Sequence, residues 1–159
     1  MINEVDQLND LDRSALFQDL TLPQLEEIVK FCTYETYNDY DILIHEDETE
    51  QFDLFLLVNG SVEIVSNNSS LTSSEVVLSK EDKDIYGEAS WLTKHKRSAT
   101  VRCKGPVEAI RIDGKALEHH LQEDYSAGYA IMKNIAILLA ERMQHTDNLL
   151  KQLLWNSGV

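Results

Sequence analysis

Basic residues are scarce in this chain of 159 residues. It has 14 Lys and Arg residues against 28 Asp and Glu residues, which gives a formal net charge of −14 at pH 7. A protein that binds a nucleic-acid backbone needs a positive face to displace counterions, so the composition argues against nucleic-acid binding. The same negative charge disfavours binding to an anionic membrane surface.

Cysteines and long apolar runs are also scarce. The only two cysteines, Cys32 and Cys103, form no C-x-x-C motif, so we expect buried, reduced thiols in a cytoplasmic protein. The N-terminal residues are acidic and carry no long apolar run, which argues against a secretory signal. No apolar stretch reaches the roughly 18 residues of a membrane-spanning helix, so we expect no membrane span.

Motifs for catalysis and metal binding are missing. The five histidines are scattered, and none forms an H-x-x-x-H or H-E-x-x-H pair. His119 and His120 are adjacent, so on a helix their side chains point about 100° apart and make a poor joint metal site. We read acidic groups such as Glu46-Asp47-Glu48 as solvated loops. The sequence therefore predicts neither an enzyme nor a metal site.

The first part of the chain, up to about Cys32, has the pattern of short helices. Leu8, Leu11, Leu16 and Leu20 mark an apolar face. The segment Thr21-Leu22-Pro23-Gln24 predicts a helix start, because Thr and Gln at this spacing form a capping box and Pro is favoured early in a helix.

Residues 33–112 read as many short strands separated by turns. Asn59-Gly60 lies between two apolar runs and predicts a hairpin, because a type I′ turn needs positive φ at both central residues. Short strands at this spacing favour a closed or double-sheet β fold. The other predicted turns are Asn38-Asp39, Asn67-Asn68-Ser69-Ser70, Lys104-Gly105-Pro106 and Asp113-Gly114.

The last part of the chain predicts one long helix, because residues 125–155 contain no Pro and a single Gly, Gly128. Its apolar stripe is wide enough to cover the β domain and also to pair with a second copy of the helix; a helix packed wholly on its own domain is the alternative. Two polar residues, Arg142 and Thr146, interrupt the seam and either fix its register or face a ligand. The heptad seam consists of Ile135, Leu139, Arg142, Thr146, Leu149 and Leu153, widened by Ile131, Leu138, Met143, Leu150 and Leu154.

One basic run stands out against the acidic background. Residues 94–104 hold five of the 14 Lys and Arg residues, and no acid lies between Glu88 and Glu108. Before this run, Gly87 permits close approach of the backbone and a short helix offers unpaired N–H groups to an anion. Arg97 adds a planar fork for phosphate oxygens. These features favour a small-anion site.

Glu88 narrows the class of ligand, since a carboxylate repels phosphate but accepts a hydrogen bond from a hydroxyl. Phosphate next to a ribose hydroxyl would satisfy Glu88, Arg97 and the hydroxyl of Ser98 together. The alternative is a β-hairpin tip with solvated basic side chains and a Glu88 that only caps a helix. The residue types alone leave both interpretations open.

A family resemblance favours the ligand site. Ile85-Tyr86-Gly87-Glu88, followed by Arg97-Ser98-Ala99-Thr100-Val101, resembles the phosphate-binding cassette of the cyclic nucleotide-binding domain family. That family includes catabolite activator proteins and the regulatory subunits of cyclic AMP-dependent protein kinase. The segments 16–21 and 58–64 and the last helix resemble further parts of the family pattern, so the likeness covers most of the chain.

The resemblance implies an α+β, mainly β fold: a double-stranded β-helix of the jelly-roll or β-roll type, flanked by N-terminal helices and a long C-terminal helix. Residues 1–124 would form the helices and the β-roll, and residues 125–159 the helix for dimerisation and output. Glu88 would bind the ribose 2′-hydroxyl, Arg97 the cyclic phosphate, and Thr146 the adenine amino group. The implied ligand residues are Gly87, Glu88, Ala89, Ser90, Arg97, Ser98, Ala99, Arg142 and Thr146.

Ser98 favours cyclic AMP over cyclic GMP, because cyclic GMP-selective members of the kinase branch tend to have Thr after the cassette Arg. We therefore expect a homodimeric sensor module without a DNA-binding domain that signals to an unidentified protein by moving its C-terminal helix.

Some positions depart from the family pattern. Tyr40, Asp47 and Lys83 stand where glycines are usual and predict different turns, and Trp91 and Lys96 replace the usual Leu and Pro. The alternative function is a structural dimerisation module whose nucleotide pocket has degenerated.

Overall fold

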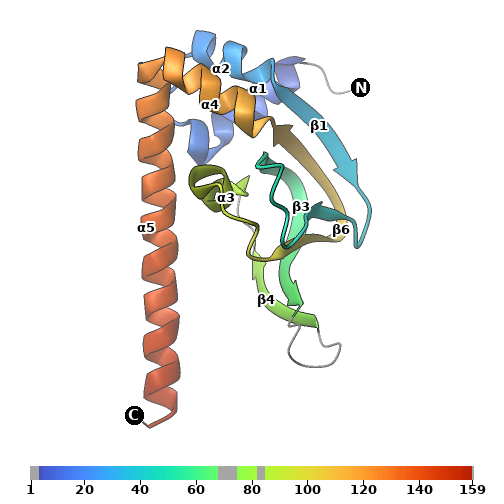
Figure 1. Cartoon of the computed structure of the whole chain (residues 1–159), viewed down its shortest axis with the longest axis vertical. Helices are drawn as coiled ribbons and strands as arrows, with labels where there is room; N and C mark the ends of the chain where they lie inside the picture. Colours follow the sequence, from blue (N-terminus) through green and yellow to red (C-terminus); the bar gives the residue numbers. More distant parts are fainter. Residues whose placement is uncertain (1–3, 68–74, 82–84, 159) are drawn as a thin grey trace.

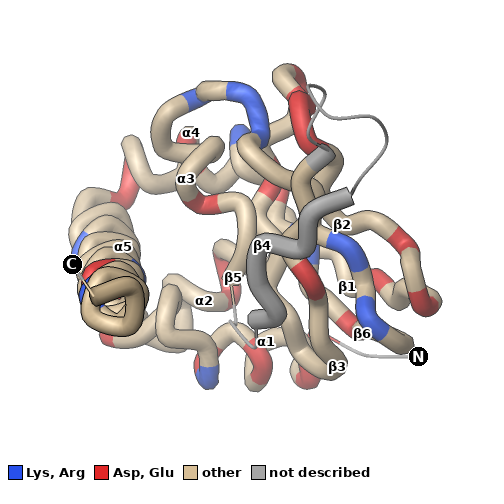
Figure 2. The backbone as a smooth tube through the Cα atoms, turned by 90° about the horizontal axis from the view of Figure 1, so that it is seen from below, with Lys and Arg blue, Asp and Glu red and all other residues tan. Residues whose placement is uncertain are grey.

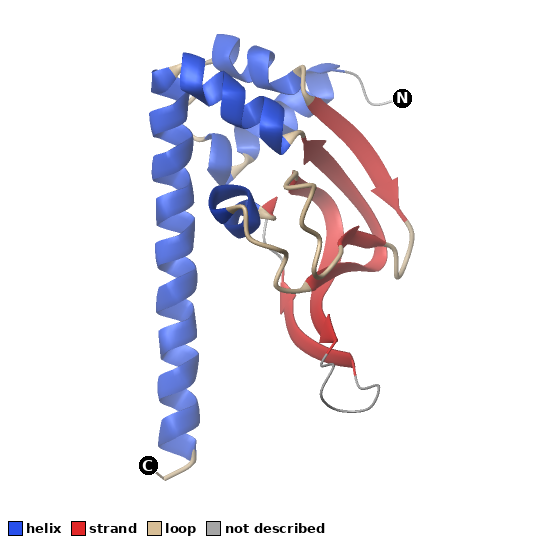
Figure 3. Ribbon diagram, viewed as in Figure 1, coloured by secondary structure: helices blue, strands red, loops and turns tan. Residues whose placement is uncertain are grey.

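The computed structural model describes residues 4–67, 75–81 and 85–158 of the chain. Its helices are α1 (Glu4–Arg13), the 3-10 helix η1 (Ala15–Phe17), α2 (Leu22–Val29), α3 (Glu88–Thr93), α4 (Gly114–Glu123) and α5 (Tyr125–Asn156). Its strands are β1 (Cys32–Tyr37), β2 (Ile42–Ile44), β3 (Leu54–Asn67), β4 (Glu75–Glu81), β5 (Ile85–Tyr86) and β6 (Thr100–Ile112). Helices α1, α2 and α4 gather at one end of the curved sheet, and α5 runs from that end alongside the strands (Figures 1 and 3).

The two long strands β3 and β6 form the centre of the sheet. They pair antiparallel from Leu54 opposite Ile112 to Val65 opposite Thr100. On the other edge of β6 lie β1 and β2, whereas β5 and β4 pair with successive parts of β3. Each long strand therefore has two short neighbours along its length. This curved antiparallel sheet with flanking helices confirms the predicted β-roll fold.

The hairpin predicted at Asn59-Gly60 is wrong. These residues lie inside the continuous strand β3, where the register with β6 shifts on either side of Asn59. Gly60 has φ of +99°, and a Cβ there would lie 2.5 Å from the carbonyl oxygen of Pro106 on β6. A glycine with positive φ is typical of some β-bulges as well as of type I′ turns, so Gly60 correctly indicated positive φ but lies in a strand and not in a hairpin turn.

The other predicted turns had mixed outcomes. Asn38-Asp39 does form a turn, with Asp41 N donating to Asn38 O at 3.1 Å. The prediction at 104–106 is wrong, because these residues continue β6 with Gly105 at φ of +79°. Asp113-Gly114 instead begins α4, where the Asp113 carboxylate caps the helix. The turn predicted at 67–70 falls largely outside the described residues.

The capping box at the start of α2 is confirmed. Thr21 N donates to Gln24 Oε1 at 2.9 Å, and Gln24 N donates to Thr21 Oγ1 at 3.4 Å. The helical part ends at Cys32, where β1 begins, as the sequence predicts. Of the predicted apolar face, Leu11 and Leu16 are fully buried in the core beneath the helices.

Helix α5 belongs to the same core over its first turns. Ala127, Ile131 and Ile135 are buried with residues of α1, α2 and α4. Ile135 therefore packs inside its own domain, although the sequence places it in a seam for a second copy. The part of the seam that solvent can reach begins at Leu139, which is 36% exposed.

Candidate nucleotide site

The cassette begins at the junction between β5 and α3. Gly87 lies at this junction with φ of +92°, in the left-handed region that favours glycine. A Cβ at Gly87 would lie 2.7 Å from Arg97 Nη1 and 2.8 Å from Asp53 O. Glycine is therefore required here both for the turn and for the close approach of Arg97.

The predicted ligand residues converge on one pocket of about 140 Å³. Eight of the nine residues that the sequence nominates line this pocket, and Thr146 does not. The pocket also includes four side chains that the sequence did not nominate, Ile44, Ile64, Tyr86 and Val101, which line the interior of the roll. Their alternating positions on strands are typical of any core, so the sequence held no signal that separates pocket lining from packing. The nominated members of the wall are Gly87, Glu88, Ala89, Ser90, Arg97, Ser98, Ala99 and Arg142.

Glu88 and Arg142 join the cassette to helix α5. Glu88 is only 5% exposed, and its carboxylate forms an ion pair with Arg142 Nη1. Arg142 Nη2 also donates to the carbonyl oxygen of Ile85 at 3.1 Å. A buried charge pair is costly to break by removing one partner, because the other charge is then left in a poorly solvated site. The pair therefore fixes the middle of α5 against the start of α3.

The guanidinium group of Arg97 donates hydrogen bonds to main-chain carbonyl groups. Nη1 donates to Gly87 O at 3.0 Å, and Nη2 donates to Gln51 O at 3.1 Å and to Asp53 O at 2.8 Å. Arg97 is 4% exposed, and its burial lowers the pKa of the guanidinium below the ordinary value. Every residue has a main-chain carbonyl group, so the residue types do not indicate which carbonyls accept from Arg97, and these contacts could not be predicted.

Thr146 lies one turn beyond Arg142 on α5. It is exposed, and its hydroxyl donates to Arg142 O at 3.0 Å. The structure therefore places Thr146 on the helix that borders the pocket but not in the pocket wall. Its role in reading a base stays a prediction.

The basic run around Arg97 is largely balanced by acids from other segments. Ion pairs join Lys94 to Glu118 at 2.6 Å, Lys96 to Asp47 at 2.9 Å, and Arg102 to Glu63 at 2.6 Å. Asp and Glu residues are spread over many segments of the fold (Figure 2). Of the cations in the run, only Arg97 lines the pocket.

The turns at Tyr40 and Asp47 do not differ as the sequence predicts. Their φ values are +66° and +68°, so both residues adopt the left-handed conformation that glycine favours. The third such position, Lys83, lies outside the described residues. Trp91 is buried in the core beneath the helices, where its indole N–H donates to Gly114 O at 2.7 Å, and it does not line the pocket.

The described residues contain neither a candidate metal site nor a candidate membrane-spanning helix. Within residues 4–67, 75–81 and 85–158, no three His, Cys, Asp or Glu side chains cluster as metal ligands would. In the same part of the chain, no helix combines the length and the apolar character needed to cross a membrane.

Comparison with known families gives one match. The model of the cyclic nucleotide-binding domain matches residues 34–124, which is more than half of the chain. This range contains the β-roll, the cassette and α4, but not α5. No curated protein matches the chain.

Several solved structures have a similar fold. A cyclic nucleotide-binding domain from Methylobacillus flagellatus aligns with a TM-score of 0.75 and 19% identity, over 91% of this chain and 81% of that one. The Thermus thermophilus catabolite activator protein aligns with a TM-score of 0.69 and 21% identity, over 88% of this chain and 63% of its own. The regulatory domain of Toxoplasma gondii PKA, solved with cAMP, aligns with a TM-score of 0.68 and 12% identity, over 89% of this chain and 50% of its own. At these identities the likeness concerns the fold.

Proposed function

The chain belongs to the cyclic nucleotide-binding domain family, and on that premise we propose that it is a cytoplasmic sensor that binds cyclic AMP and signals through α5. The family domain is a regulatory module, so we assign this domain no catalysis. The downstream target would be another protein rather than a nucleic acid or a membrane, because the chain carries a net charge of −14.

The convergence of the cassette residues carries this proposal. Glu88 and Arg97 come from separate segments yet line one pocket together with Ser98. A carboxylate beside a guanidinium suits a ligand that has both a hydroxyl donor and a phosphate. A ribose carrying a cyclic phosphate has these two groups side by side. Ser98 following Arg97 favours cyclic AMP.

Nucleotide binding must rearrange the contacts that now hold the side chains of Arg97 and Glu88. Arg97 would exchange its carbonyl partners for phosphate oxygens, and Glu88 would share its ion pair with the ribose hydroxyl. The pocket of about 140 Å³ is smaller than the ~300 Å³ at which ligand pockets usually begin, so either Arg97 or α5 has to move. Because Arg142 connects Glu88 to α5, the ligand would shift the population of α5 positions.

The second half of α5 supports a homodimer. Met143, Leu150 and Leu153 are 66%, 56% and 67% exposed, and their spacings of 7 and 3 residues fit the heptad repeat of a coiled coil. Exposed apolar groups in such a row mark an interaction surface rather than a solvated helix. A second α5 would cover them and would bring Thr146 into the interface.

One observation favours a second function, a dimerisation module without a ligand. Both groups that would bind the nucleotide already have protein partners, because Arg97 contacts carbonyls and Glu88 contacts Arg142. If these contacts were stronger than those to a nucleotide, the pocket would stay closed.

Calorimetric titration separates the two functions. We expect saturable micromolar binding of cyclic AMP, weaker binding of cyclic GMP, and loss of the heat signal in Arg97→Ala. Lys96→Ala is the matched control, because Lys96 is an exposed cation next to Arg97 that pairs with Asp47 outside the pocket. No heat from either nucleotide with the folded wild type would reject the sensor and leave the dimerisation module.

A further inference from the structure

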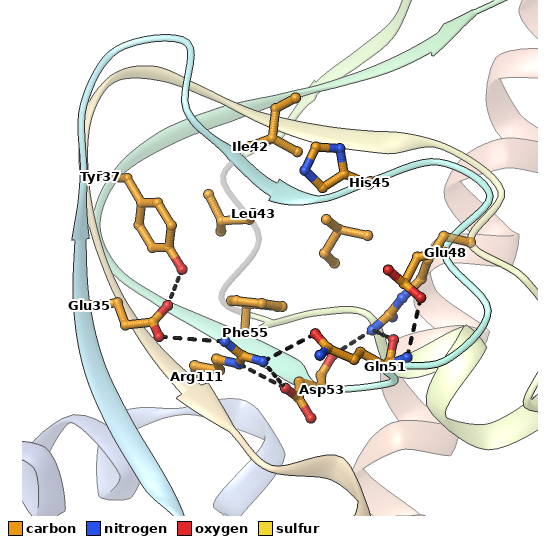
Figure 4. Close-up of a pocket in the computed structure, with 12 residues that line it drawn as sticks. Glu35, Tyr37, Ile42, Leu43, His45, Glu48, Gln51, Asp53, Phe55 and Arg111 are labelled. Carbon is orange, nitrogen blue, oxygen red and sulfur yellow. Dashed lines mark hydrogen bonds and ion pairs between the residues drawn. The ribbon is translucent and has the colours of Figure 1, made fainter.

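A second and larger cavity shares Arg97 and Ile44 with the nucleotide pocket. It has a volume of about 310 Å³, within the ~300 to 1,000 Å³ of most small-molecule sites. Figure 4 shows side chains from β1, β2, β3 and β6 and from the loop before β3 pointing into the same hollow. The nucleotide pocket uses none of the residues drawn there except Arg97 and Ile44.

One part of this cavity is apolar. Leu43 and Ile44 of β2 and Phe55 of β3 are each less than 10% exposed, and Ile42 lies at the rim with 37% exposure. The ring of Tyr37 forms the wall contributed by β1 (Figure 4). Aromatic and aliphatic walls of this kind favour the flat, apolar face of a ring over a compact ion.

The other part is a network of charged and polar groups. Arg111 Nε donates to Asp53 Oδ2 at 2.7 Å, and Arg111 Nη1 lies 3.7 Å from Glu35 Oε1. Tyr37 donates its hydroxyl hydrogen to Glu35. Burial and this hydrogen bond raise the pKa of Tyr37, so it stays a neutral donor across the physiological range. The network therefore holds the polar edge of the cavity in one arrangement.

Charges of both signs line the cavity. Burial alone would lower the pKa of Arg111, yet its hydrogen bond and ion pair with Asp53 raise it, so it remains a cation. Arg97 is the second guanidinium, and its Nε is one of two buried side-chain polar atoms without a hydrogen-bond partner in the described part of the chain. The carboxylates in the wall belong to Glu35, Glu48 and Asp53.

This mixture limits the class of ligand. The carboxylates would repel a simple anion, and the two guanidinium groups would repel a simple cation. A neutral ring with alternating hydrogen-bond donors and acceptors on its edge would satisfy both. Arg and Gln side chains read purine edges in this way, and Asp or Glu accepts from the amino group of a base. The apolar walls of Phe55 and Tyr37 would flank the faces of such a ring.

We propose that this cavity is a second ligand site, which takes a neutral heteroaromatic ring of the purine-base class, separate from the cassette pocket. Arg97 lies in the wall of both sites, so occupation of the cavity would alter the contacts that hold Arg97 on Gln51 and Asp53.

Titration of the full ¹⁵N-labelled chain with adenine and with hypoxanthine tests the site by NMR. We expect saturable shifts at Tyr37, Phe55 and Arg111. The variant Ile42→Trp should abolish them, because the larger side chain would fill the cavity from a rim position that is 37% exposed. Arg111→Gln should weaken binding about tenfold or more, the range expected when a hydrogen bond to a charged group is lost.

Arg102→Gln is the matched control, since it removes another β6 cation that pairs with Glu63 and does not line the cavity, and binding should not change. The proposal is overturned if neither base gives saturable shifts, or if Ile42→Trp binds as well as the wild type. It is also overturned if the shifts fall on Glu88 and Ala99, because the base would then occupy the cassette pocket.

Discussion

The two halves of α5 carry similar apolar side chains in opposite surroundings. In the first half, Ile131 and Ile135 are at most 2% exposed and pack with α1, α2 and α4. In the second half, Leu150 and Leu153 are more than half exposed. Arg142 stands between the two halves and ties the helix to the cassette through Glu88. The comparison teaches that the same helix stabilises the domain with one half and leaves the apolar side chains of the other half exposed, with the candidate nucleotide site at the boundary.

The largest effect should come from Ile131→Ala in the first half. Ile131 is fully buried, so the change removes buried methyl groups and leaves a cavity, at a cost of about 2 to 5 kcal/mol of unfolding free energy. Urea unfolding followed by circular dichroism measures it. A loss below about 1 kcal/mol would contradict the tight packing of this half.

The next largest effect should come from Asn134→Ala on the buried face. Asn134 Nδ2 donates to Leu16 O at 2.9 Å and to Gln18 O at 2.8 Å, so the change leaves two main-chain acceptors without this donor. We expect a loss of about 1 to 3 kcal/mol by urea unfolding. Lys133→Ala, on the exposed side of the same turn, should be nearly neutral. Equal losses in both variants would mean that helix propensity, and not the hydrogen bonds, explains the result.

A smaller, pH-dependent effect is expected at the start of α5. The hydrogen bond from Ala127 N holds the pKa of Asp124 below its ordinary value of 3.8. Because the folded pKa is lowered, this cap stabilises the fold fully above that value and is lost as pH falls through the folded pKa. The difference in melting temperature between wild type and Asp124→Ala should therefore be larger at pH 7 than at pH 3. Asp124→Asn keeps an acceptor without a charge, so the difference in melting temperature between Asp124→Asn and Asp124→Ala should hardly vary with pH.

The smallest effect on stability should come from Leu150→Ser in the second half. Leu150 is 56% exposed, so the unfolding free energy of the isolated chain should change by less than about 0.5 kcal/mol. Sedimentation velocity should nevertheless show weaker self-association. If Leu150→Ser left a dimer unchanged, the second half of α5 would not be its interface; if it destabilised the monomer as much as Ile131→Ala, the contrast between the halves would fail.

Local signals in the sequence predicted the fold best. The capping box of Thr21 and Gln24 depends only on neighbouring residues, and the structure has it. The glycine at position 60 was informative, but positive φ suits both a turn and a bulge, and only the pairing of β3 with the distant β6 distinguishes them. Ile135 shows, on a helix, the same limit of what local sequence signals can predict. Heptad spacing identifies an apolar row without showing whether the row faces its own domain or a partner.

The site was predictable to a similar degree. Family resemblance nominated Gly87, Glu88 and Arg97, and the structure brings them to one pocket. The resemblance did not show that Arg142 pairs with Glu88 or that Arg97 donates to main-chain carbonyls, because both contacts depend on how remote segments pack. The second cavity left no sequence signal either, since its wall is assembled from single residues of several strands and a loop.

The long pairing of β3 with β6 has a consequence for how the chain acquires its site during synthesis. The pairs run from Val65 opposite Thr100 to Leu54 opposite Ile112, and the cassette lies inside the loop that they close. Closing such a loop costs entropy before the distant contacts form, which slows folding of sheets with non-local pairing. A ribosome-bound chain therefore cannot assemble the nucleotide pocket until β6 has emerged, and Arg142 adds its contact to Glu88 only after much of α5 has followed.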